Sequence, residues 1–251
     1  MLIYQRPLFI GLMAFILISS AVVKGYCAEK TSDDAVFYFN EGNAYSDKGQ
    51  YDQAIQEFDK AIEINPKYAK AYINRGLAYK DKGEYDQAIQ DWSKAIEIDP
   101  NNIKAYMNRG TVYSITSKYD LAIKDWSKAI EIDPTDVKIY INRGNAYFEK
   151  EQYNSAIKDW SKAIEMDPNN AKVYINRGLA YRENDQHKLA IQDFTRAIDI
   201  DPNNARAYIN RGYIYLVKFQ DQEKGCLDIK RACELGDCEN YDIAKKEGYC
   251  K

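Results

Sequence analysis

The chain has 251 residues, of which 45% are hydrophobic and 29% are charged, with only 6 Pro and 13 Gly. This composition is that of a folded protein and excludes a disordered or low-complexity chain. The formal net charge of -3 gives no basic field for nucleic acid, so we expect no DNA or RNA partner. The single histidine excludes a metal site built on several histidines of one chain.

The amino-terminal segment predicts export. Met1–Pro7 carries one basic residue, Arg6, and Leu8–Val23 is an uncharged, mostly apolar run of sixteen residues. At about 1.5 Å per residue the run covers roughly 24 Å, which is shorter than the ~30 Å hydrocarbon core of a bilayer. We therefore predict a cleaved signal peptide over residues 1–28 and an exported protein, periplasmic or extracellular. The alternative is an uncleaved membrane anchor formed by residues 8–23, with the rest of the chain outside the cytoplasm.

The rest of the chain repeats a unit of 34 residues, which is most visible in its glycines and prolines. The recurring residues are Gly42, Gly76, Gly110, Gly144, Gly178 and Gly212, and Pro66, Pro100, Pro134, Pro168 and Pro202. Each unit has two stretches with apolar residues at helical spacing, separated by a polar turn, and the second stretch ends where proline cannot continue a helix. The pattern predicts an all-α fold of helix-turn-helix units over 35–68, 69–102, 103–136, 137–170, 171–204 and 205–238.

The large and small residues of each unit resemble the tetratricopeptide repeat (TPR) family. Tyrosine stands at the fourth and eleventh places, glycine at the eighth, alanine at the twentieth and twenty-seventh, and Phe or Trp at the twenty-fourth. In the second unit these residues are Tyr72, Tyr79, Gly76, Ala88, Ala95 and Trp92. The resemblance covers Ala35 to Cys238. It implies a right-handed α-solenoid superhelix of tandem helix pairs, with the first helices on the concave face.

The seventh place departs from the family pattern, because arginine replaces the expected leucine in five units. These residues are Arg75, Arg109, Arg143, Arg177 and Arg211. Carboxylates recur at the twenty-third place, but the first unit has Glu41 at its seventh place and leaves Glu57 without a basic partner of its own. We therefore predict a ladder of ion pairs between successive units: Glu57 with Arg75, Asp91 with Arg109, Asp125 with Arg143, Asp159 with Arg177, and Asp193 with Arg211.

Asparagine occupies the sixth place of every unit, on the first helix, where its propensity is poor. The row is Asn40, Asn74, Asn108, Asn142, Asn176 and Asn210. It resembles the asparagine ladder of the O-linked N-acetylglucosamine transferase superhelix, which grips the backbone of an extended peptide. A carboxamide both donates and accepts hydrogen bonds, so such a row predicts peptide binding. The alternative is that each asparagine bonds a carbonyl of a neighbouring helix.

Two further rows lie near the asparagines. Four residues earlier, on the same helical face, are Lys70, Lys104, Lys138, Lys172 and Arg206. They predict a basic groove that prefers an acidic peptide, unless they form only a solvated surface. The fifth place is apolar, with Phe39, Ile73, Met107, Ile141, Ile175 and Ile209. This row offers side-chain pockets and lacks the lysine of the chaperone-binding carboxylate clamp, so a chaperone cofactor role is not supported.

Four of the 5 cysteines, Cys226, Cys233, Cys238 and Cys250, lie near the carboxyl end. An even cluster in an exported chain predicts disulfides. An amphipathic helix over Glu239–Glu247 that folds back onto the sixth unit favours Cys226 with Cys250 and Cys233 with Cys238, so that residues 239–251 form a tethered cap. Buried thiols or a zinc site built on cysteines alone are the alternatives, although no Cys-x-x-Cys spacing exists.

The sequence shows no constellation that supports catalysis. It has no Ser-His-Asp set, phosphate loop, paired carboxylates or metal cluster, so we expect no enzyme activity and no cofactor. We predict a scaffold that binds an extended peptide or protein segment in its concave groove outside the cytoplasm. The alternative is an accessory subunit or regulator of an envelope enzyme or secretion complex, which binds through the convex face or the capped end. A membrane contact is expected only through an uncleaved amino-terminal segment, and the oligomeric state stays open.

Overall fold

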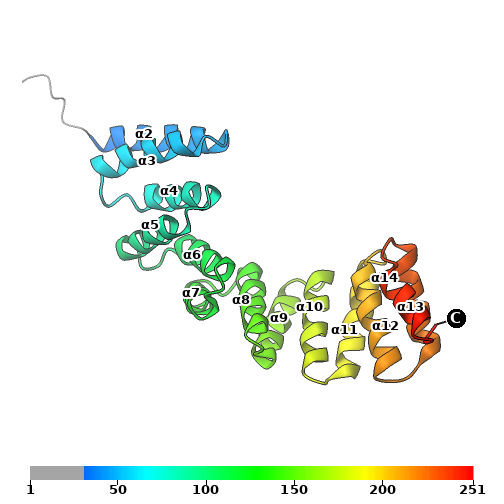
Figure 1. Cartoon of the computed structure of the whole chain (residues 1–251). Coiled ribbons are helices and arrows are strands. Elements are labelled where there is room, and N and C mark those ends of the chain that lie inside the picture. The colour runs from blue at the N-terminus through cyan, green and yellow to red at the C-terminus, as the bar shows by residue number, and fades with distance from the viewer. Residues whose placement is uncertain (1–30, 251) are drawn as a thin grey trace, which may run out of the picture.

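A computed structural model describes residues 31–250, so the predicted signal peptide lies outside the described residues. The described part contains helices only, and they form an elongated, curved array with its first and last helices at opposite ends (Figure 1). The predicted all-α solenoid is thereby confirmed. The helices are α2 (Ser32–Asp47), α3 (Tyr51–Ile64), α4 (Ala69–Asp81), α5 (Tyr85–Ile98), α6 (Ile103–Ile115), α7 (Tyr119–Ile132), α8 (Val137–Glu149), α9 (Tyr153–Met166), α10 (Ala171–Glu183), α11 (His187–Ile200), α12 (Ala205–Val217), α13 (Gln222–Glu234) and α14 (Glu239–Lys246).

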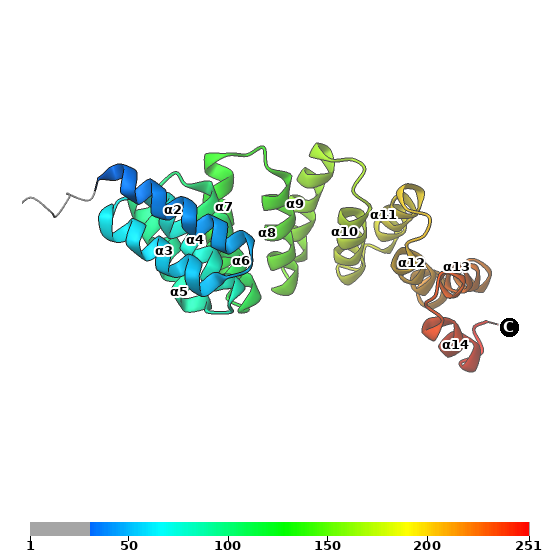
Figure 2. The same cartoon turned by 90° about the horizontal axis from the view of Figure 1, so that it is seen from above.

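The helices pack in pairs, one pair to each repeat: α2 with α3, α4 with α5, and so on to α12 with α13. First helices of successive repeats also touch one another, as α2 does with α4, α4 with α6, α6 with α8 and α8 with α10. They therefore share one side of the array. Each pair is turned relative to the pair before it, which gives the array its superhelical curvature (Figures 1 and 2). No helix within residues 31–250 has the length and apolar character needed to cross a membrane.

Close approach within each pair depends on the glycine at the eighth place. A Cβ atom on Gly76 would lie 2.7 Å from Nε1 of Trp92, and one on Gly144 would lie 2.7 Å from Nε1 of Trp160. Such separations are shorter than van der Waals contact allows, so only glycine fits against the aromatic ring. The aromatic side chains are buried at the centre of the first five repeats, and Ile229 takes this place against Gly212 in the sixth.

Two of the buried tryptophans are hydrogen-bonded and the third is not. The indole N–H groups of Trp92 and Trp160 donate to the carbonyl oxygens of Ile73 and Ile141, at 3.1 Å and 3.3 Å. Trp126 is equally buried, but its Nε1 has no partner within residues 31–250. The equivalent carbonyl belongs to Met107, which instead accepts the hydroxyl of Thr111 at 2.8 Å. No other repeat has serine or threonine at that place, which explains the difference.

This difference predicts unequal costs for the same substitution. Trp92→Phe loses a hydrogen bond that Trp126→Phe does not, and Phe58 and Phe194 already fill the same wedge in two other repeats. We expect Trp92→Phe to lower the free energy of unfolding by about 1 kcal/mol more than Trp126→Phe. Urea denaturation of the two variants measures this difference. Equal losses would show that the indole bond contributes nothing measurable.

The predicted ladder of ion pairs between successive repeats is wrong. Each arginine binds the carboxylate of its own repeat through Nε and Nη2, at 2.6–2.8 Å. The observed pairs are Arg75 with Asp91, Arg109 with Asp125, Arg143 with Asp159, Arg177 with Asp193, and Arg211 with Asp228. Glu57, which suggested the other register, pairs with Lys60 one turn along its own helix at 2.7 Å.

The guanidinium nevertheless joins successive repeats through its third nitrogen. Nη1 of Arg109 donates to the hydroxyl of Ser93 in the preceding repeat at 2.7 Å, and Nη1 of Arg143 donates to Ser127 at 2.9 Å. Because the two helices of one repeat are antiparallel neighbours, the carboxylate closest to Arg109 is that of Asp125, sixteen residues onward. In the preceding repeat Arg109 contacts Ser93, two residues after its predicted partner Asp91. The arginine therefore fixes both the helix pair and the stacking of repeats.

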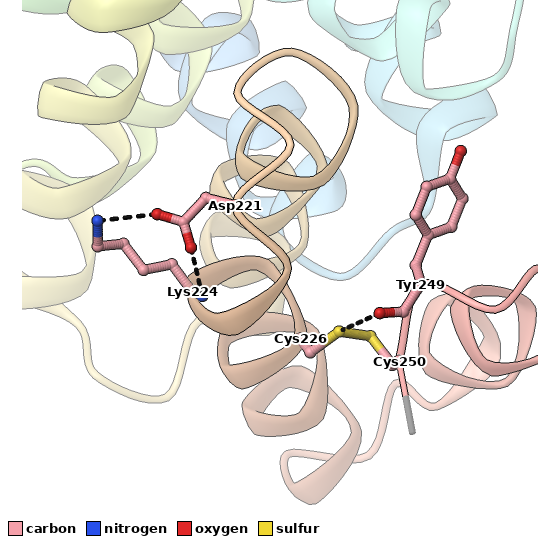
Figure 3. The surroundings of a disulfide bond; sticks show 5 residues. All are labelled: Asp221, Lys224, Cys226, Tyr249 and Cys250. Atoms are coloured by element: carbon pink, nitrogen blue, oxygen red, sulfur yellow. Dashed lines mark hydrogen bonds and ion pairs between the residues drawn. A yellow bond between two sulfur atoms is a disulfide. The ribbon is translucent and has the colours of Figure 1, made fainter.

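A short helix caps the carboxyl end, as the sequence predicts. Helix α14 packs on α13 and contributes Ala244 to a small apolar cluster with Leu216, Ile229 and Cys250. Disulfides join Cys226 to Cys250 and Cys233 to Cys238, with Cα–Cα distances of 5.5 Å and 3.9 Å, which is the pairing preferred from the sequence. Figure 3 shows the first of these bonds linking α13 to the final residues of the chain, where Sγ of Cys226 lies 3.2 Å from the carbonyl oxygen of Tyr249.

Candidate functional site

The asparagine row lies on the first helices and opens into hollows on the side that these helices share. Between α2, α4 and α6 a hollow of about 590 Å³ is lined by Asn74, the apolar residues Phe39 and Ile73, and the cations Lys70 and Lys104. The structure therefore brings members of the three predicted rows to one surface. We call this surface the inner groove; it consists of the second, fifth, sixth, ninth and thirteenth places of the six first helices.

Two more hollows continue the inner groove toward the carboxyl end. One, of about 270 Å³, is lined by the groove residues Asn145, Glu149, Asn176, Leu179 and Arg206, and also by Phe148 and Trp160. The next, of about 400 Å³, contains the last asparagine of the row, Asn210. Polar and apolar side chains alternate along the groove, which suits a chain that offers both a backbone and side chains.

Two asparagines of the row bond asparagines of the preceding repeat. Asn74 donates to Oδ1 of Asn43 at 2.6 Å, and Asn176 donates to Oδ1 of Asn145 at 3.2 Å. Each bond uses one donor, so the oxygen and the second N–H of Asn74 and Asn176 stay free for a ligand. Asn43 and Asn145 stand at the ninth place and were not among the predicted site residues. Their signal in the sequence is an asparagine three residues after another, on the same helical face.

Asn210 has a structural role. It is 9% exposed, donates to the carbonyl oxygen of Arg206 at 2.7 Å and accepts from Nη1 of Arg182 at 2.6 Å. The carbonyl of Arg206 belongs to the same helix, α12, so the bond differs from the predicted alternative, in which each asparagine bonds a carbonyl of a neighbouring helix. The row therefore ends, as a set of available carboxamides, before the last repeat.

The remaining three asparagines, Asn40, Asn108 and Asn142, form no side-chain hydrogen bond with any other residue of the described chain. Asn40 is exposed, whereas Asn108 and Asn142 are half-buried in the central repeats. A half-buried carboxamide without a protein partner depends on water or on a ligand for its hydrogen bonds. Asn108 and Asn142 are therefore the most available members of the row.

The five cations at the second place are all exposed, and none forms an ion pair within residues 31–250. They are Lys70, Lys104, Lys138, Lys172 and Arg206. The second helices differ, because Lys94, Lys128 and Lys162 there pair with glutamates at 2.8–2.9 Å. Positive charge without a partner thus collects on one edge of the inner groove.

The arrangement holds no metal centre within the described residues, where no three ligating side chains of Asp, Glu, His or Cys converge. What the inner groove offers is hydrogen-bonding carboxamides, apolar surface, cations at the second place and carboxylates at the thirteenth place, which are Asp47, Asp81, Glu149 and Glu183. Groups of these kinds are suited to binding and orienting a ligand.

Comparison with protein families decides what kind of repeat this is. A model described as TPR repeat matches residues 42–83, 76–114, 115–150 and 144–185, and models described as tetratricopeptide repeat match residues 171–204 and 194–237. The chain belongs to the tetratricopeptide repeat family. The matches extend over most of the array from α2 to α13 and agree with the resemblance that the sequence shows.

Solved structures of TPR proteins share this fold. The chain is 26% identical to YrrB, described as a TPR protein with an unusual peptide-binding site, with a TM-score of 0.67 over 75% of this chain and 97% of that one. It is 28% identical to MamA, with a TM-score of 0.62 over 68% of this chain and 96% of that one. MamA residues 41-end from Desulfovibrio magneticus RS-1 are 24% identical, with a TM-score of 0.64 over 68% and 97%, which shows the fold alone. No curated protein sequence matches the chain.

Proposed function

We propose that this TPR protein is a non-catalytic scaffold that binds an extended segment of another protein in its inner groove, outside the cytoplasm. The observation that carries the proposal is the pair of unpartnered carboxamides, Asn108 and Asn142, each four residues after an exposed cation, Lys104 or Lys138, on the same helix. A carboxamide satisfies both the N–H and the C=O of a peptide unit, so the groove holds a backbone irrespective of its sequence. The unusual peptide-binding site of YrrB, which has a similar array of repeats, supports the same use here.

The row of cations along one edge of the groove favours a ligand whose acidic residues lie along that edge, at the other end of the first helices from the carboxylates of the thirteenth place. The five cations of the second place have no carboxylate partner within residues 31–250, and each stands at the start of a first helix, where the helix dipole adds positive potential. Aspartate and glutamate side chains of a ligand supply the missing partners. Binding of such a segment is therefore expected to weaken as salt is raised.

Location outside the cytoplasm rests on two features of the chain. The amino-terminal sequence has the layout of a secretory signal, and two disulfides near the carboxyl end suit an oxidising compartment. Both features support a periplasmic or extracellular placement. If the apolar segment is retained, it anchors the array to the membrane.

The test uses peptides selected from a displayed random library on the wild-type chain. Their affinity is then measured on Asn108→Ala/Asn142→Ala and on a matched control, Gln56→Ala/Gln90→Ala, which removes two exposed carboxamides from the second helices α3 and α5. We expect the asparagine variant to bind about tenfold more weakly, because two hydrogen bonds of ordinary strength are lost. The control is expected to bind as the wild type does.

Two results contradict the proposal. The first is that no peptide is enriched on the wild-type chain. The second is that the asparagine variant, with unchanged helicity by circular dichroism, binds the selected peptides as tightly as the control. In the second case the convex face or the capped end binds the partner.

A further inference from the structure

The last first helix, α12, differs from the others in what it presents to the inner groove. Tyr213 and Val217, at the ninth and thirteenth places, follow Ile209 at intervals of four and form an apolar stripe on one helical face. Tyr213 and Val217 are 46% and 42% exposed. At the thirteenth place the earlier repeats carry Asp47, Asp81, Ile115, Glu149 and Glu183, so the stripe is not a framework feature of the repeat.

Helix α14 supplies a second apolar wall opposite this stripe. Ile243 of α14 and Tyr249 after it line the same hollow as Tyr213 and Val217, with Leu216 and Ile229 among the lining residues. Ile243 is 47% exposed. The hollow measures about 370 Å³, which is enough for a bulky apolar side chain. We call it the terminal cleft.

The terminal cleft continues the inner groove. It shares Ile209, Tyr213 and Asn240 with the neighbouring hollow, which contains the last asparagine of the row, Asn210. Charges of both signs line the neighbouring hollow, with Lys218 on one hand and Glu183 and Asp185 on the other. Lys218 has no ion pair within residues 31–250. A segment that lies along the inner groove therefore reaches the terminal cleft directly, and passes charged side chains of both signs on the way.

We propose that the terminal cleft is the anchoring subsite for a bulky apolar side chain, aromatic or aliphatic, of the protein segment bound in the inner groove. The inference rests on the proposed function and adds what fixes the position of the ligand. Carboxamides that bind a backbone give no register, because every peptide unit is alike. A single apolar pocket at one end supplies register, and burial of one large side chain there adds affinity of the kind that dominates interfaces.

The subsite depends on the disulfides, because one of its walls is α14. The bond from Cys226 to Cys250 ties the end of the chain to α13, next to the residues that line the cleft (Figure 3). The cap therefore has a binding role besides covering the end of the solenoid. Reduction is expected to remove the anchoring contribution and to leave backbone binding in the inner groove.

The test compares labelled twelve-residue peptides of Glu, Ser and Gly. Two carry a Trp-Leu pair, near the amino or the carboxyl end, and a third has Ala-Ala instead. We expect one of the Trp-Leu peptides to bind the wild-type chain at least about tenfold more tightly than the Ala-Ala peptide. Val217→Asp and Ile243→Asp, one on each wall, are each expected to abolish this gain. The matched control is Leu121→Asp, an apolar residue of α7 that is 44% exposed outside the cleft.

The outcomes separate this inference from the proposed function. If the Trp-Leu and Ala-Ala peptides bind equally, or if the gain survives both cleft substitutions, the anchoring subsite is wrong while backbone binding stands. If no peptide of either kind binds the wild-type chain, the proposed function itself fails. Sedimentation of the free chain provides a further check: dimers that Val217→Asp dissociates would make a second copy the occupant and overturn the inference.

Discussion

Replacing Arg143 with leucine is expected to lower the free energy of unfolding by about 3 kcal/mol or more, because it leaves a buried carboxylate without its counter-ion. Asp159 is 4% exposed and receives Nε and Nη2 of Arg143 at 2.7 Å each. The substitution also removes the hydrogen bond that Nη1 of Arg143 donates to Ser127 of the preceding repeat, so a contact between successive repeats is lost together with the ion pair. Denaturation with urea, followed by circular dichroism, measures the change.

The control is a solvent-exposed ion pair on α9, the helix that carries Asp159. Glu165→Gln breaks the exposed pair with Lys162 on α9 and is expected to cost less than about 1 kcal/mol. Arg143→Leu combined with Asp159→Ala is expected to recover part of the loss, since no charge is then stranded. If Arg143→Leu costs no more than Glu165→Gln, the buried pairs do not hold the repeats together.

Burial makes each pair costly to break, although the intact pair adds little net stability. It raises the pKa of Asp91 and Asp193 above the ordinary aspartate value, even though the facing guanidinium lowers it. At these two carboxylates burial thus outweighs the effect of the guanidinium on the pKa. Each arginine also lies within 6.0 Å of a tyrosine ring, as Arg143 does with Tyr140 and Tyr147, so its plane is held in one position. Removing one partner of a buried pair is costly because the other charge is left unpaired. A leucine at the seventh place, as in the usual family pattern, leaves no unpaired charge when the facing residue is not a carboxylate.

Replacing Cys226 and Cys250 together with serine is expected to release α14 and to destabilise the carboxyl-terminal end by about 3 kcal/mol, the chain-entropy cost for a loop of this size. The two cysteines are 24 residues apart. Helix α14 has 8 residues, too few to persist alone in water, and its apolar cluster is small. Hydrogen exchange of the amides from Glu239 to Cys250 measures the release.

The second disulfide is the matched control. Cys233 and Cys238 are only 5 residues apart, so their replacement by serine is expected to cost about 2 kcal/mol and to leave the end of the chain tethered. If the amides of α14 stay equally protected in both variants, apolar packing alone holds the cap. The binding gain of a Trp-Leu peptide is expected to disappear with the first pair and to persist without the second.

The repeat architecture follows from the sequence because its determinants are local. Gly76, Trp92 and the Asp-Pro break after α5 act within one repeat, and the same residues recur 34 positions later. The partner of each arginine does not follow, since carboxylates 16 residues onward and 18 residues back are both plausible until the packing of the helices is known. One misleading residue, Glu57, favoured the wrong choice because its partner Lys60 lies on its own helix.

The candidate site could be predicted only in part. The rows at the second and sixth places follow from the spacing of the residues. The sequence does not show that the carboxamide of Asn210 is hydrogen-bonded to the guanidinium of Arg182 and the carbonyl of Arg206, while that of Asn108 has no protein partner within residues 31–250. The terminal cleft requires the position of α14, which the cysteines suggest but which only the fold brings opposite Tyr213. Contacts between side chains of different helices could not be predicted from the sequence, because they depend on how the helices pack.

The most direct test of peptide binding in the inner groove is a titration of the isotope-labelled chain with a selected peptide, observed through its side-chain amide resonances. The inner groove predicts that the resonances of Asn108 and Asn142 shift on binding, while those of Gln56 and Gln90 on the second helices stay in place. Shifts confined to the glutamines, with both asparagines unchanged at saturation, would contradict binding in the groove.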